Sequence, residues 1–303
     1  MNILSRPKKE KKGKPCLGGI AIYIAFLVSL LLTYFLRPGI ENRLLGLLLS
    51  STMIVILGLV DDIRDLRPFV KITVELLVIA FLISAGFVTK IAFLPPWANA
   101  MVTFMWVLAI INAFNLLDIV DGLTSGLVIV ISSTLLAISL INKDMFSSMV
   151  LTALLGAHLG FIKYNYPPAR VYMGDAGSLF SGFVLATVAI KISYAPIERP
   201  VALITPILAM SLPIYDTLFL IIMRVRKKKP IFSKTDDHFA LRLVTMGNSV
   251  NKSIWIMYAF SVFLAVSSLI VAFGSNAMGI FVIIIVALVF IFMGKKSRGG
   301  QGK

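Results

Sequence analysis

The stretch Asn112-Ala-Phe-Asn-Leu-Leu-Asp-Ile-Val-Asp-Gly122 places amides and carboxylates at the end of a long apolar run that carries no charge. Its polar residues recur at every third position. On a helix, steps of about 300° keep Asn115, Asp118 and Asp121 within about a third of the circumference. A carboxylate at the end of a membrane helix is costly unless it faces water, a cation or a partner. We therefore expect these three side chains to face one functional centre.

The composition predicts an integral membrane protein built from α-helices. Of the 303 residues, 58% are hydrophobic and 14% are charged, and the mean hydropathy is +0.95. These values are far from those of a soluble domain. The net charge of +15 does not indicate nucleic acid, because the basic residues form short clusters between apolar segments, a pattern typical of topology signals and contacts with membrane lipids. Cys16 is the only cysteine, which excludes an intrachain disulfide.

Apolar segments long enough to span a bilayer recur along the chain. They lie at about 19–36, 44–60, 70–89, 98–117, 123–142, 146–162, 177–192, 201–223, 253–273 and 277–294. The first segment is followed by no small-residue cleavage site, so we expect it to stay in the mature protein. The sequence thus predicts a polytopic domain of about ten transmembrane helices over 19–294, between a basic segment at 1–18 and a basic tail at 295–303.

Loop charge predicts the orientation. When the loops are assigned alternately to two sides, most of the 29 lysines and arginines fall on one side. The positive-inside rule then places both termini in the cytoplasm. The acidic groups that follow the second, fourth, sixth and eighth segments fall on the same side: Asp61-Asp62, Asp118 with Asp121, Asp175 and Asp236-Asp237. Carboxylates clustered on a basic face indicate a site for a divalent cation and a phosphorylated ligand.

The acidic pair is expected to open the loop Asp61-Asp-Ile-Arg-Asp65. Two adjacent carboxylates can share magnesium, hold a cationic group or supply a general base, although a solvated acidic turn has the same sequence. Lys71 precedes Glu75 by one helical turn, a spacing that predicts an ion pair between the two side chains.

A second candidate region runs from Lys163 to Ser178 with the sequence KYNYPPARVYMGDAGS. Its glycines allow the backbone to approach a phosphate, and the helix expected to start at Ser178 offers amides to an anion. Asp175, at the expected tip of the loop, then lies where magnesium bridges protein and pyrophosphate. The alternative is a plain glycine-rich turn.

The long loop at 224–252 combines a basic cluster with Asp236, Asp237, His238 and Arg242. Asp216 lies about two turns inside the eighth segment. An intramembrane carboxylate there is either part of the site or structurally paired.

Taken together, these motifs resemble the polyprenyl-phosphate N-acetylhexosamine-1-phosphate transferases, the membrane family that includes phospho-N-acetylmuramoyl-pentapeptide transferase. The resemblance covers most of the chain and runs through Pro15-Cys-Leu-Gly-Gly19, Asp61-Asp62, the stretch 112–122, Asn165-Tyr-Pro-Pro-Ala169, Met173-Gly-Asp-Ala-Gly-Ser178 and His238. It implies an enzyme with a shallow cytoplasmic site in the bacterial inner membrane, and the segment count above predicts ten helices for it.

The resemblance also implies the reaction and the roles of the residues. The reaction moves an N-acetylhexosamine 1-phosphate from a UDP-sugar to undecaprenyl phosphate and releases UMP, with Mg²⁺ or Mn²⁺ as cofactor. Asp61, Asp62, Asp118 and Asp121 match catalytic positions, and Asp175 with Asn115 matches the metal site. Asn165, Tyr172, Lys71, His238 and Arg242 match substrate-binding positions, with the ring of Tyr172 placed to stack on uracil. A homodimer is compatible with the packing of many spans.

Three features depart from the family pattern. The usual His-x-His-His-Arg-Leu is His238-Phe-Ala-Leu-Arg-Leu243 here, and Ile119 replaces a glycine. Relatives usually carry one more helix before the Pro15–Gly19 segment, so either the start is shortened or the bundle has ten spans. Because the loop lacks the triple-histidine form associated with the muramoyl-pentapeptide donor, we expect UDP-N-acetylglucosamine as donor.

Two rival functions stay open at this point. UDP-N-acetylmuramoyl-pentapeptide is the alternative donor within the same reaction class. A transporter or flippase is the alternative from another class, and it predicts acids at mid-membrane depth and broken helices.

Overall fold

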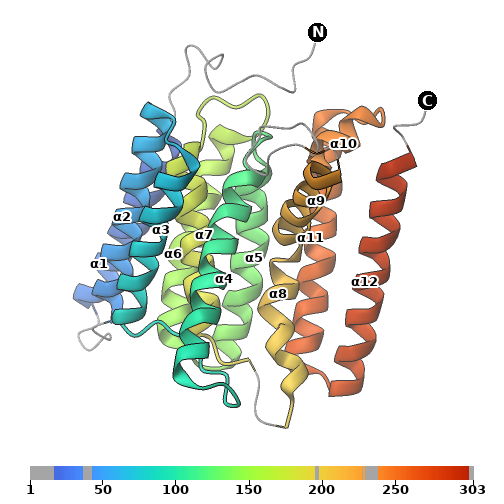
Figure 1. Ribbon diagram of the computed structural model, residues 1–303. Helices are drawn as coiled ribbons and strands as arrows, with labels where there is room; N and C mark the ends of the chain where they lie inside the picture. Colours follow the sequence, from blue (N-terminus) through green and yellow to red (C-terminus); the bar gives the residue numbers. More distant parts are fainter. Residues whose placement is uncertain (1–16, 37–42, 195–197, 227, 229–237, 300–303) are drawn as a thin grey trace. The chain divides into compact units, whose positions relative to one another are not determined.

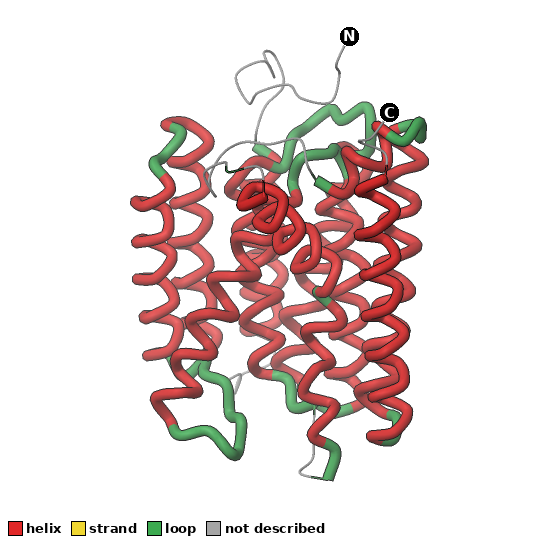
Figure 2. The backbone as a smooth tube through the Cα atoms, turned by 45° about the vertical axis from the view of Figure 1, so that its right-hand side comes forward, coloured by secondary structure: helices red, strands yellow, loops and turns green. Residues whose placement is uncertain are grey.

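The computed structural model describes residues 17–36, 43–194, 198–226, 228 and 238–299. Its chain divides into two compact units, an N-terminal unit (Lys14–Ser193) and a C-terminal unit whose described part begins at Tyr194. Among the described residues the regular elements are helices, joined by loops and turns, and no strand occurs (Figure 2). The predicted all-α membrane architecture is confirmed.

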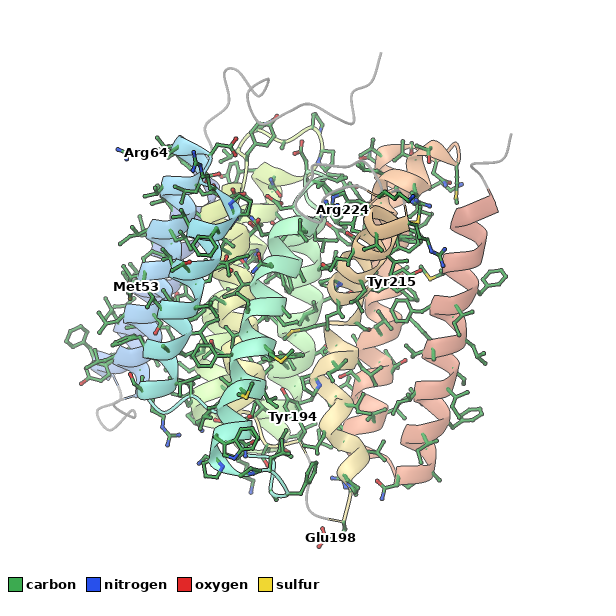
Figure 3. The ribbon with its side chains drawn as sticks, in the orientation of Figure 1. Met53, Arg64, Tyr194, Glu198, Tyr215 and Arg224 are labelled. Carbon is green, nitrogen blue, oxygen red and sulfur yellow. The ribbon has the colours of Figure 1, made fainter. Side chains whose placement is uncertain are left out.

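The N-terminal unit is a bundle of helices that run side by side (Figure 1). Its helices are α1 (Gly18–Leu36), α2 (Arg43–Arg64), α3 (Pro68–Ser84), α4 (Pro96–Leu117), α5 (Leu123–Ile141), α6 (Met145–Asn165) and α7 (Gly174–Lys191). Prolines in the first turn of α3 and α4 fit there because the missing amide would have no partner inside the helix. The outer surface is apolar, as with Met53 on α2, which is 41% exposed (Figure 3).

Helix α7 is the centre of this unit. It contacts α1, α2, α4, α5 and α6, and every residue from Asp175 to Ala189 is buried. Small residues make this possible, because a Cβ on Gly19 of α1 would lie 2.3 Å from the amide nitrogen of Gly177, and one on Gly58 of α2 would lie 2.4 Å from the Cα of Ala176. Backbones that approach this closely hold the start of α7 rigidly between α1 and α2.

The C-terminal unit contains a short 3₁₀ turn η2 (Pro200–Ile204), α8 (Thr205–Ala209), α9 (Ser211–Arg226), α10 (Phe239–Thr245), α11 (Val250–Phe273) and α12 (Asn276–Gly299). The segment Pro200–Ala209 meets Ser211–Arg226 at a bend of 72°. Pro213 has no amide hydrogen to donate to the carbonyl four residues earlier, which accounts for a break at this point. The span predicted over 201–223 is therefore a bent pair of helices, which counts as one span if the two are taken together.

The number of spans is also lower than predicted. By length and hydropathy, seven described helices qualify as membrane spans, α1, α2, α4, α5, α6, α11 and α12, or eight if the bent pair counts as one. Helices also occupy the other two predicted positions, but α3 has 17 residues and α7 is interrupted by small polar residues. Burial explains α7, because a helix enclosed by protein does not need a lipid-facing apolar surface.

Several predicted loops are helical at their ends. Helix α2 continues through Asp61 and Asp62 to Arg64, α6 continues to Asn165, and α7 begins at Gly174. Asp175 is therefore in the first turn of a helix rather than at the tip of a loop. Helix α3 ends at Ser84 instead of residue 89, because Gly86 takes a positive φ of 90° that stops the helix. The basic segment 1–16, Asp236, Asp237 and the last residues 300–303 lie outside the described residues.

Candidate active site

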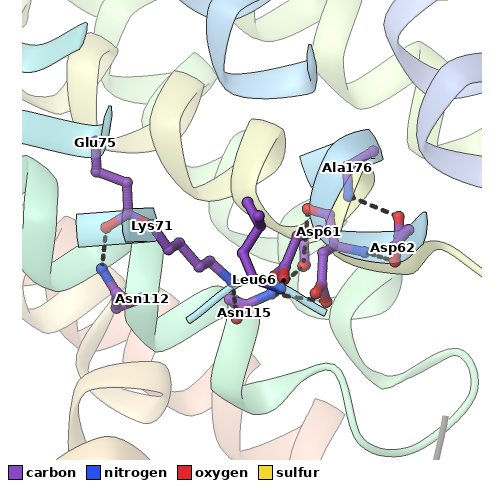
Figure 4. Close-up of polar contacts among 10 residues, drawn as sticks. Asp61, Asp62, Leu66, Lys71, Glu75, Asn112, Asn115 and Ala176 are labelled. Carbon is purple, nitrogen blue, oxygen red and sulfur yellow. Dashed lines mark hydrogen bonds and ion pairs between the residues drawn. The ribbon is translucent and has the colours of Figure 1, made fainter. Parts of the chain in front are cut away.

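Lys71 of α3 lies at the centre of a polar network in the N-terminal unit (Figure 4). Its ammonium donates to Asp61 Oδ2 of α2 at 3.0 Å and to Asn115 Oδ1 of α4 at 2.8 Å. Only 12% of the Lys71 side chain and 8% of the Asp61 side chain are exposed, so this ion pair is poorly screened by solvent. The other oxygen of Asp61 accepts the Leu66 amide at 2.8 Å. One cation thereby connects three helices.

The network continues from Asn115 to α7. The amide nitrogen of Asn115 donates to Asp175 Oδ1 at 3.0 Å and to Ser178 Oγ at 3.0 Å. The carboxyl groups of Asp61 and Asp175 also interact with each other directly. Two neighbouring carboxylates repel each other unless positive charge lies nearby. Lys71 supplies one such charge at Asp61.

Asp62 has a different structural role from Asp61. Its two oxygens accept the main-chain amides of Asp175 at 2.9 Å and Ala176 at 3.2 Å. It therefore caps the N-terminus of α7 from a neighbouring helix, and its negative charge is favourable there. Gly174 takes a φ of 72° beneath it, and a Cβ at this glycine would lie 2.6 Å from Asp62 Oδ2. This cap fixes the position of Asp175.

A second contact between α3 and α4 lies one turn further along both helices. Asn112 donates to Glu75 Oε2 at 2.7 Å and to the Leu108 carbonyl at 2.9 Å. Glu75 is fully buried, and its Oε1 has no hydrogen-bond partner among the described residues. The predicted ion pair between Lys71 and Glu75 is wrong, since Lys71 turns toward Asp61 and Asn115, where it finds a carboxylate and an amide oxygen together.

The central motif is helical only as far as Leu117. Helix α4 ends there with Asp118 as its C-cap, and residues 118–122 form a turn before α5. Gly122 allows this turn with a φ of 79°. The prediction that Asn115, Asp118 and Asp121 share one helical face is therefore wrong in its geometry. Both aspartates lie in the turn and are half-buried, and their catalytic role stays a prediction.

Asn165 connects this turn to the segment that precedes α7. Its Oδ1 accepts the Gly122 amide at 2.9 Å, and its Nδ2 donates to the Val171 carbonyl at 3.1 Å. The side chain is 3% exposed. Both ends of the amide are thus used by the protein itself, which makes Asn165 a residue that holds two loops together. Contact with substrate stays a prediction for this residue.

Tyr172 is half-buried in the segment before α7. Its carbonyl accepts the Gly18 amide at 3.0 Å, and the next carbonyl, that of Met173, accepts the Gly19 amide at 2.9 Å. Two motifs that are far apart in the sequence, Gly18-Gly19 and Met173-Gly-Asp175, are therefore joined by main-chain hydrogen bonds. The predicted stacking of the Tyr172 ring on uracil is not tested by these contacts.

The donor atoms near Asp175 fit a hard cation. The carboxylates of Asp61 and Asp175 lie together, and oxygen ligands are the ones that magnesium prefers. In the described part of the chain, no group of three or more His, Cys, Asp or Glu side chains is arranged to hold a metal. Magnesium commonly takes one or two carboxylates and completes its shell with water and substrate phosphates. Asn115 presents its nitrogen to Asp175 and its oxygen to Lys71, so in this arrangement it orients a carboxylate.

His238 and Arg242 belong to the C-terminal unit. His238 Nδ1 contacts Asp216 Oδ2 at 2.8 Å, and the guanidinium of Arg242 lies 4.6 Å from the ring centre of Phe219. All of these contacts join α9 to α10 and the residue before it. The sequence predicted that Asp216 is either part of the site or structurally paired. In the structure it is paired with His238, a predicted substrate-binding residue.

The structure thus brings Asp61, Lys71, Asn115 and Asp175 into one network. It gives Asp62 and Asn165 positions that hold neighbouring backbone. Sequence analysis missed Ser178 as a member of the network, although a serine three residues after Asp175 on a helix was a signal for a shared face. It also did not pair Glu75 with Asn112, a contact that depends on how α3 packs against α4.

Comparison with known proteins identifies a family and several relatives. The family described as glycosyl transferase family 4 matches residues 44–193. A Bacillus subtilis protein named "Probable undecaprenyl-phosphate N-acetylglucosaminyl 1-phosphate transferase" is 29% identical over 94% of this chain and 80% of its own length. A Sulfolobus acidocaldarius protein named "Putative UDP-N-acetylglucosamine-dolichyl-phosphate N-acetylglucosaminephosphotransferase" is 30% identical over 80% of this chain and 75% of its own.

A third relative has a different named substrate. The phospho-N-acetylmuramoyl-pentapeptide-transferase of Caldicellulosiruptor bescii is 31% identical over 60% of this chain and 62% of its own length. The matched family region ends at Ser193, where the N-terminal unit also ends. The buried network of Lys71, Asn115 and the two aspartates therefore lies within that region. This chain belongs to glycosyl transferase family 4.

Proposed function

We propose that the protein transfers N-acetylglucosamine 1-phosphate from UDP-N-acetylglucosamine to undecaprenyl phosphate and releases UMP, as the first membrane step of a cell-envelope glycan. The observation that carries this proposal is the buried network in which Lys71 connects Asp61 to Asn115, and Asn115 connects to Asp175. A lysine paired with one of two neighbouring carboxylates at the ends of helices suits two phosphorylated reactants, one of which is anchored in the bilayer.

The reaction needs one bond to form and one to break. An oxygen of the lipid phosphate attacks the β-phosphorus of the UDP-sugar, and the bond from that phosphorus to the oxygen shared with the α-phosphate breaks. UMP leaves with the electron pair, and the products are UMP and the polyprenyl diphosphate sugar. Both reactants are anionic, so the site must offset their repulsion as the pyrophosphate breaks.

Each residue of the network has its own proposed role in the reaction. Lys71 offsets negative charge at the reacting phosphates, and Asp61 accepts the proton of a monoprotonated acceptor phosphate, whose second pKa lies near 6. Asn115 and the capping carboxylate of Asp62 keep Asp175 in place. Asp118 and Asp121, in the turn after α4, are assigned to the nucleotide side of the site, together with Tyr172.

Mg²⁺, or Mn²⁺ in its place, is the proposed cofactor. Asp175 would hold it, with Asp61 beside it, and phosphate oxygens of the substrates would complete the shell. When bound, the metal supplies positive charge that stabilises the transferring phosphoryl group. Asn115 orients the ligand Asp175 in this scheme.

His238 and Arg242 are assigned to the UDP-sugar. The His238-Phe-Ala-Leu-Arg-Leu243 sequence favours N-acetylglucosamine over the muramoyl-pentapeptide donor, and the names of the Bacillus and Sulfolobus relatives support the same sugar. The bend between α8 and α9 is a feature that the transporter alternative predicted. It is outweighed by the family to which the chain belongs and by the location of the acidic network at helix ends.

We place the protein in the bacterial cytoplasmic membrane with both termini and the site on the cytoplasmic side, on the basis of the positive-inside bias. There the lipid phosphate reaches the ends of α2, α4 and α7 while its tail stays in hydrocarbon. We add a homodimer to the proposal, because the packing of many spans is compatible with one.

The decisive experiment measures UMP release by the purified protein in detergent. Release from UDP-N-acetylglucosamine that requires both undecaprenyl phosphate and Mg²⁺, and that stops when the metal is chelated, is the expected result. Release from UDP-N-acetylmuramoyl-pentapeptide alone would overturn the proposed donor. Absence of release with either donor would overturn the proposed activity.

A further inference from the structure

Asp216 is the most deeply buried acidic group of the C-terminal unit among the described residues, with 1% of its surface exposed. It is the sixth residue of α9, beyond the bend between Ala209 and Ser211. Both of its oxygens have partners: Oδ2 lies 2.8 Å from His238 Nδ1, and Oδ1 accepts the main-chain amide of Phe239 at 2.7 Å. A buried carboxylate is stable only with such partners, and here both partners belong to the start of α10.

The surroundings of this contact hold the histidine in one place. The Tyr215 ring meets the Phe239 ring edge to face at 6.3 Å, and Arg242 lies over the Phe219 ring. Residues 215, 216 and 219 lie in one stretch of α9, and they contact residue 238, which precedes α10, and residues 239 and 242 of α10. Figure 3 shows Tyr215 on α9. Asp216 and His238 are 1% and 4% exposed, so little water reaches their hydrogen bond, and such bonds are stronger when water is excluded.

From this geometry we infer that Asp216 is a positioning residue, which fixes the ring orientation and tautomer of His238 so that Nε2 is the atom presented to the UDP-sugar. The inference rests on the proposed function only where it assigns His238 to the donor. A carboxylate accepts hydrogen bonds and cannot donate them, so the proton must be on Nδ1. With Nδ1 engaged by Asp216, Nε2 faces away from the carboxylate.

The substitution Asp216→Asn separates this role from a merely structural one. Asparagine has nearly the same shape, and its Oδ1 still accepts the Phe239 amide. Its NH₂ group then faces His238 Nδ1 and can only donate, so the histidine must move its proton to Nε2. The fold is kept while the tautomer is reversed, a change that costs activity where the free nitrogen touches the substrate.

A spectroscopic test reads the tautomer directly. The chain has two histidines, His158 and His238, so the ¹⁵N-histidine spectrum of the purified full-length protein is simple. The signals that disappear in His238→Gln belong to His238, and the remaining signals belong to His158. We expect Nδ1 of His238 to carry a proton in the wild type and to lose it in Asp216→Asn. An unchanged Nδ1 signal in the variant would overturn the inference, whatever the enzyme assay gives.

The kinetic test uses a double-mutant cycle. Asp216→Asn is expected to lower kcat/KM for the UDP-sugar by about 10- to 100-fold, the range for loss of a residue that orients a functional histidine. In the His238→Gln background the same substitution should change kcat/KM less than twofold, because its effect acts through the histidine. The inference would be overturned if the losses from Asp216→Asn and His238→Gln multiply in the double variant. It would also be overturned if Asp216→Asn alone stays within twofold of the wild type. Glu198→Gln, an exposed carboxylate of the same unit, is the control and should match the wild type.

Discussion

The two units use acidic side chains in opposite ways. In the N-terminal unit, carboxylates from α2 and α7 interact with each other, one of them is paired with Lys71, and the network extends over four helices. In the C-terminal unit, a single carboxylate on α9 is fully engaged by one histidine and one backbone amide. The first arrangement concentrates negative charge that can bind a cation, whereas in the second both carboxylate oxygens hold the residues at the start of α10.

The proposed roles follow this difference, with the reacting groups assigned to the N-terminal unit and the histidine and arginine assigned to the UDP-sugar in the C-terminal unit. The family match covers residues 44–193 and ends with the N-terminal unit, so the network around Lys71 belongs to the part of the chain that defines the family. The departure from the His-x-His-His-Arg-Leu pattern lies in the C-terminal unit. Changes in the N-terminal unit should therefore abolish turnover of every donor, and changes around His238 should alter the efficiency with which a particular donor is used.

The largest effect is expected for Asp175→Asn. Removing this carboxylate from the start of α7 should lower UMP release by at least about 100-fold with either UDP-sugar, since the charge of the proposed metal ligand is lost. Thermal unfolding should stay close to that of the wild type. Asp144→Asn, which alters a carboxylate that caps α6, is the control for loss of an acid and should keep its activity. A near-normal rate for Asp175→Asn would remove the basis of the metal assignment.

The second largest effect is expected for Lys71→Met, which should lower kcat by about 30- to 100-fold. Because the buried Asp61 would be left without its cation, we expect the free energy of unfolding to fall by about 3 kcal/mol. The double variant Lys71→Met with Asp61→Asn should recover much of this stability but none of the activity. Lys90→Met, at an exposed position in the same unit, serves as control. Full activity in the double variant would show that the network is structural only.

Asp62→Asn distinguishes the cap from its neighbour Asp61. The asparagine can accept one of the two amides of α7 but not both, so we expect about 1 to 2 kcal/mol less stability and roughly a tenfold loss of activity. Asp144→Asn should cost a similar stability without a loss of rate, because both carboxylates cap helices and only Asp62 holds Asp175. If Asp62→Asn and Asp61→Asn lose activity equally, the division of roles within the acidic pair is wrong.

Arg242→Lys is the mildest change and tests the other side of the comparison. Lysine keeps the charge but stacks less well on Phe219, which is worth about 1 kcal/mol. We expect kcat/KM for the UDP-sugar to fall three- to tenfold while KM for undecaprenyl phosphate stays constant. The exposed Lys252→Arg is the matched control. A loss that affects both substrates equally would place Arg242 outside donor recognition.

Part of the site was predictable because its signals are local. The residues Asp61, Lys71, Asn115 and Asp175 stand out as charges and amides at the ends of apolar segments, and the structure brings them together. The helical face shared by Asn115, Asp118 and Asp121 was not predictable in detail. The apolar pattern continues past Leu117, but Gly122 with its positive φ allows a turn that the pattern does not reveal.

By itself, the sequence determined that this chain is a helical membrane protein, where most helices lie and which acids gather near the ends of those helices. These properties follow from hydropathy and residue type, which act over a few turns of chain. Only the tertiary structure decided that Lys71 pairs with Asp61 instead of Glu75, that Asp62 caps α7 and that Asp216 holds His238. Each of these side chains has several chemically similar partners available, and the choice among them depends on the distance and rotation at which whole helices pack.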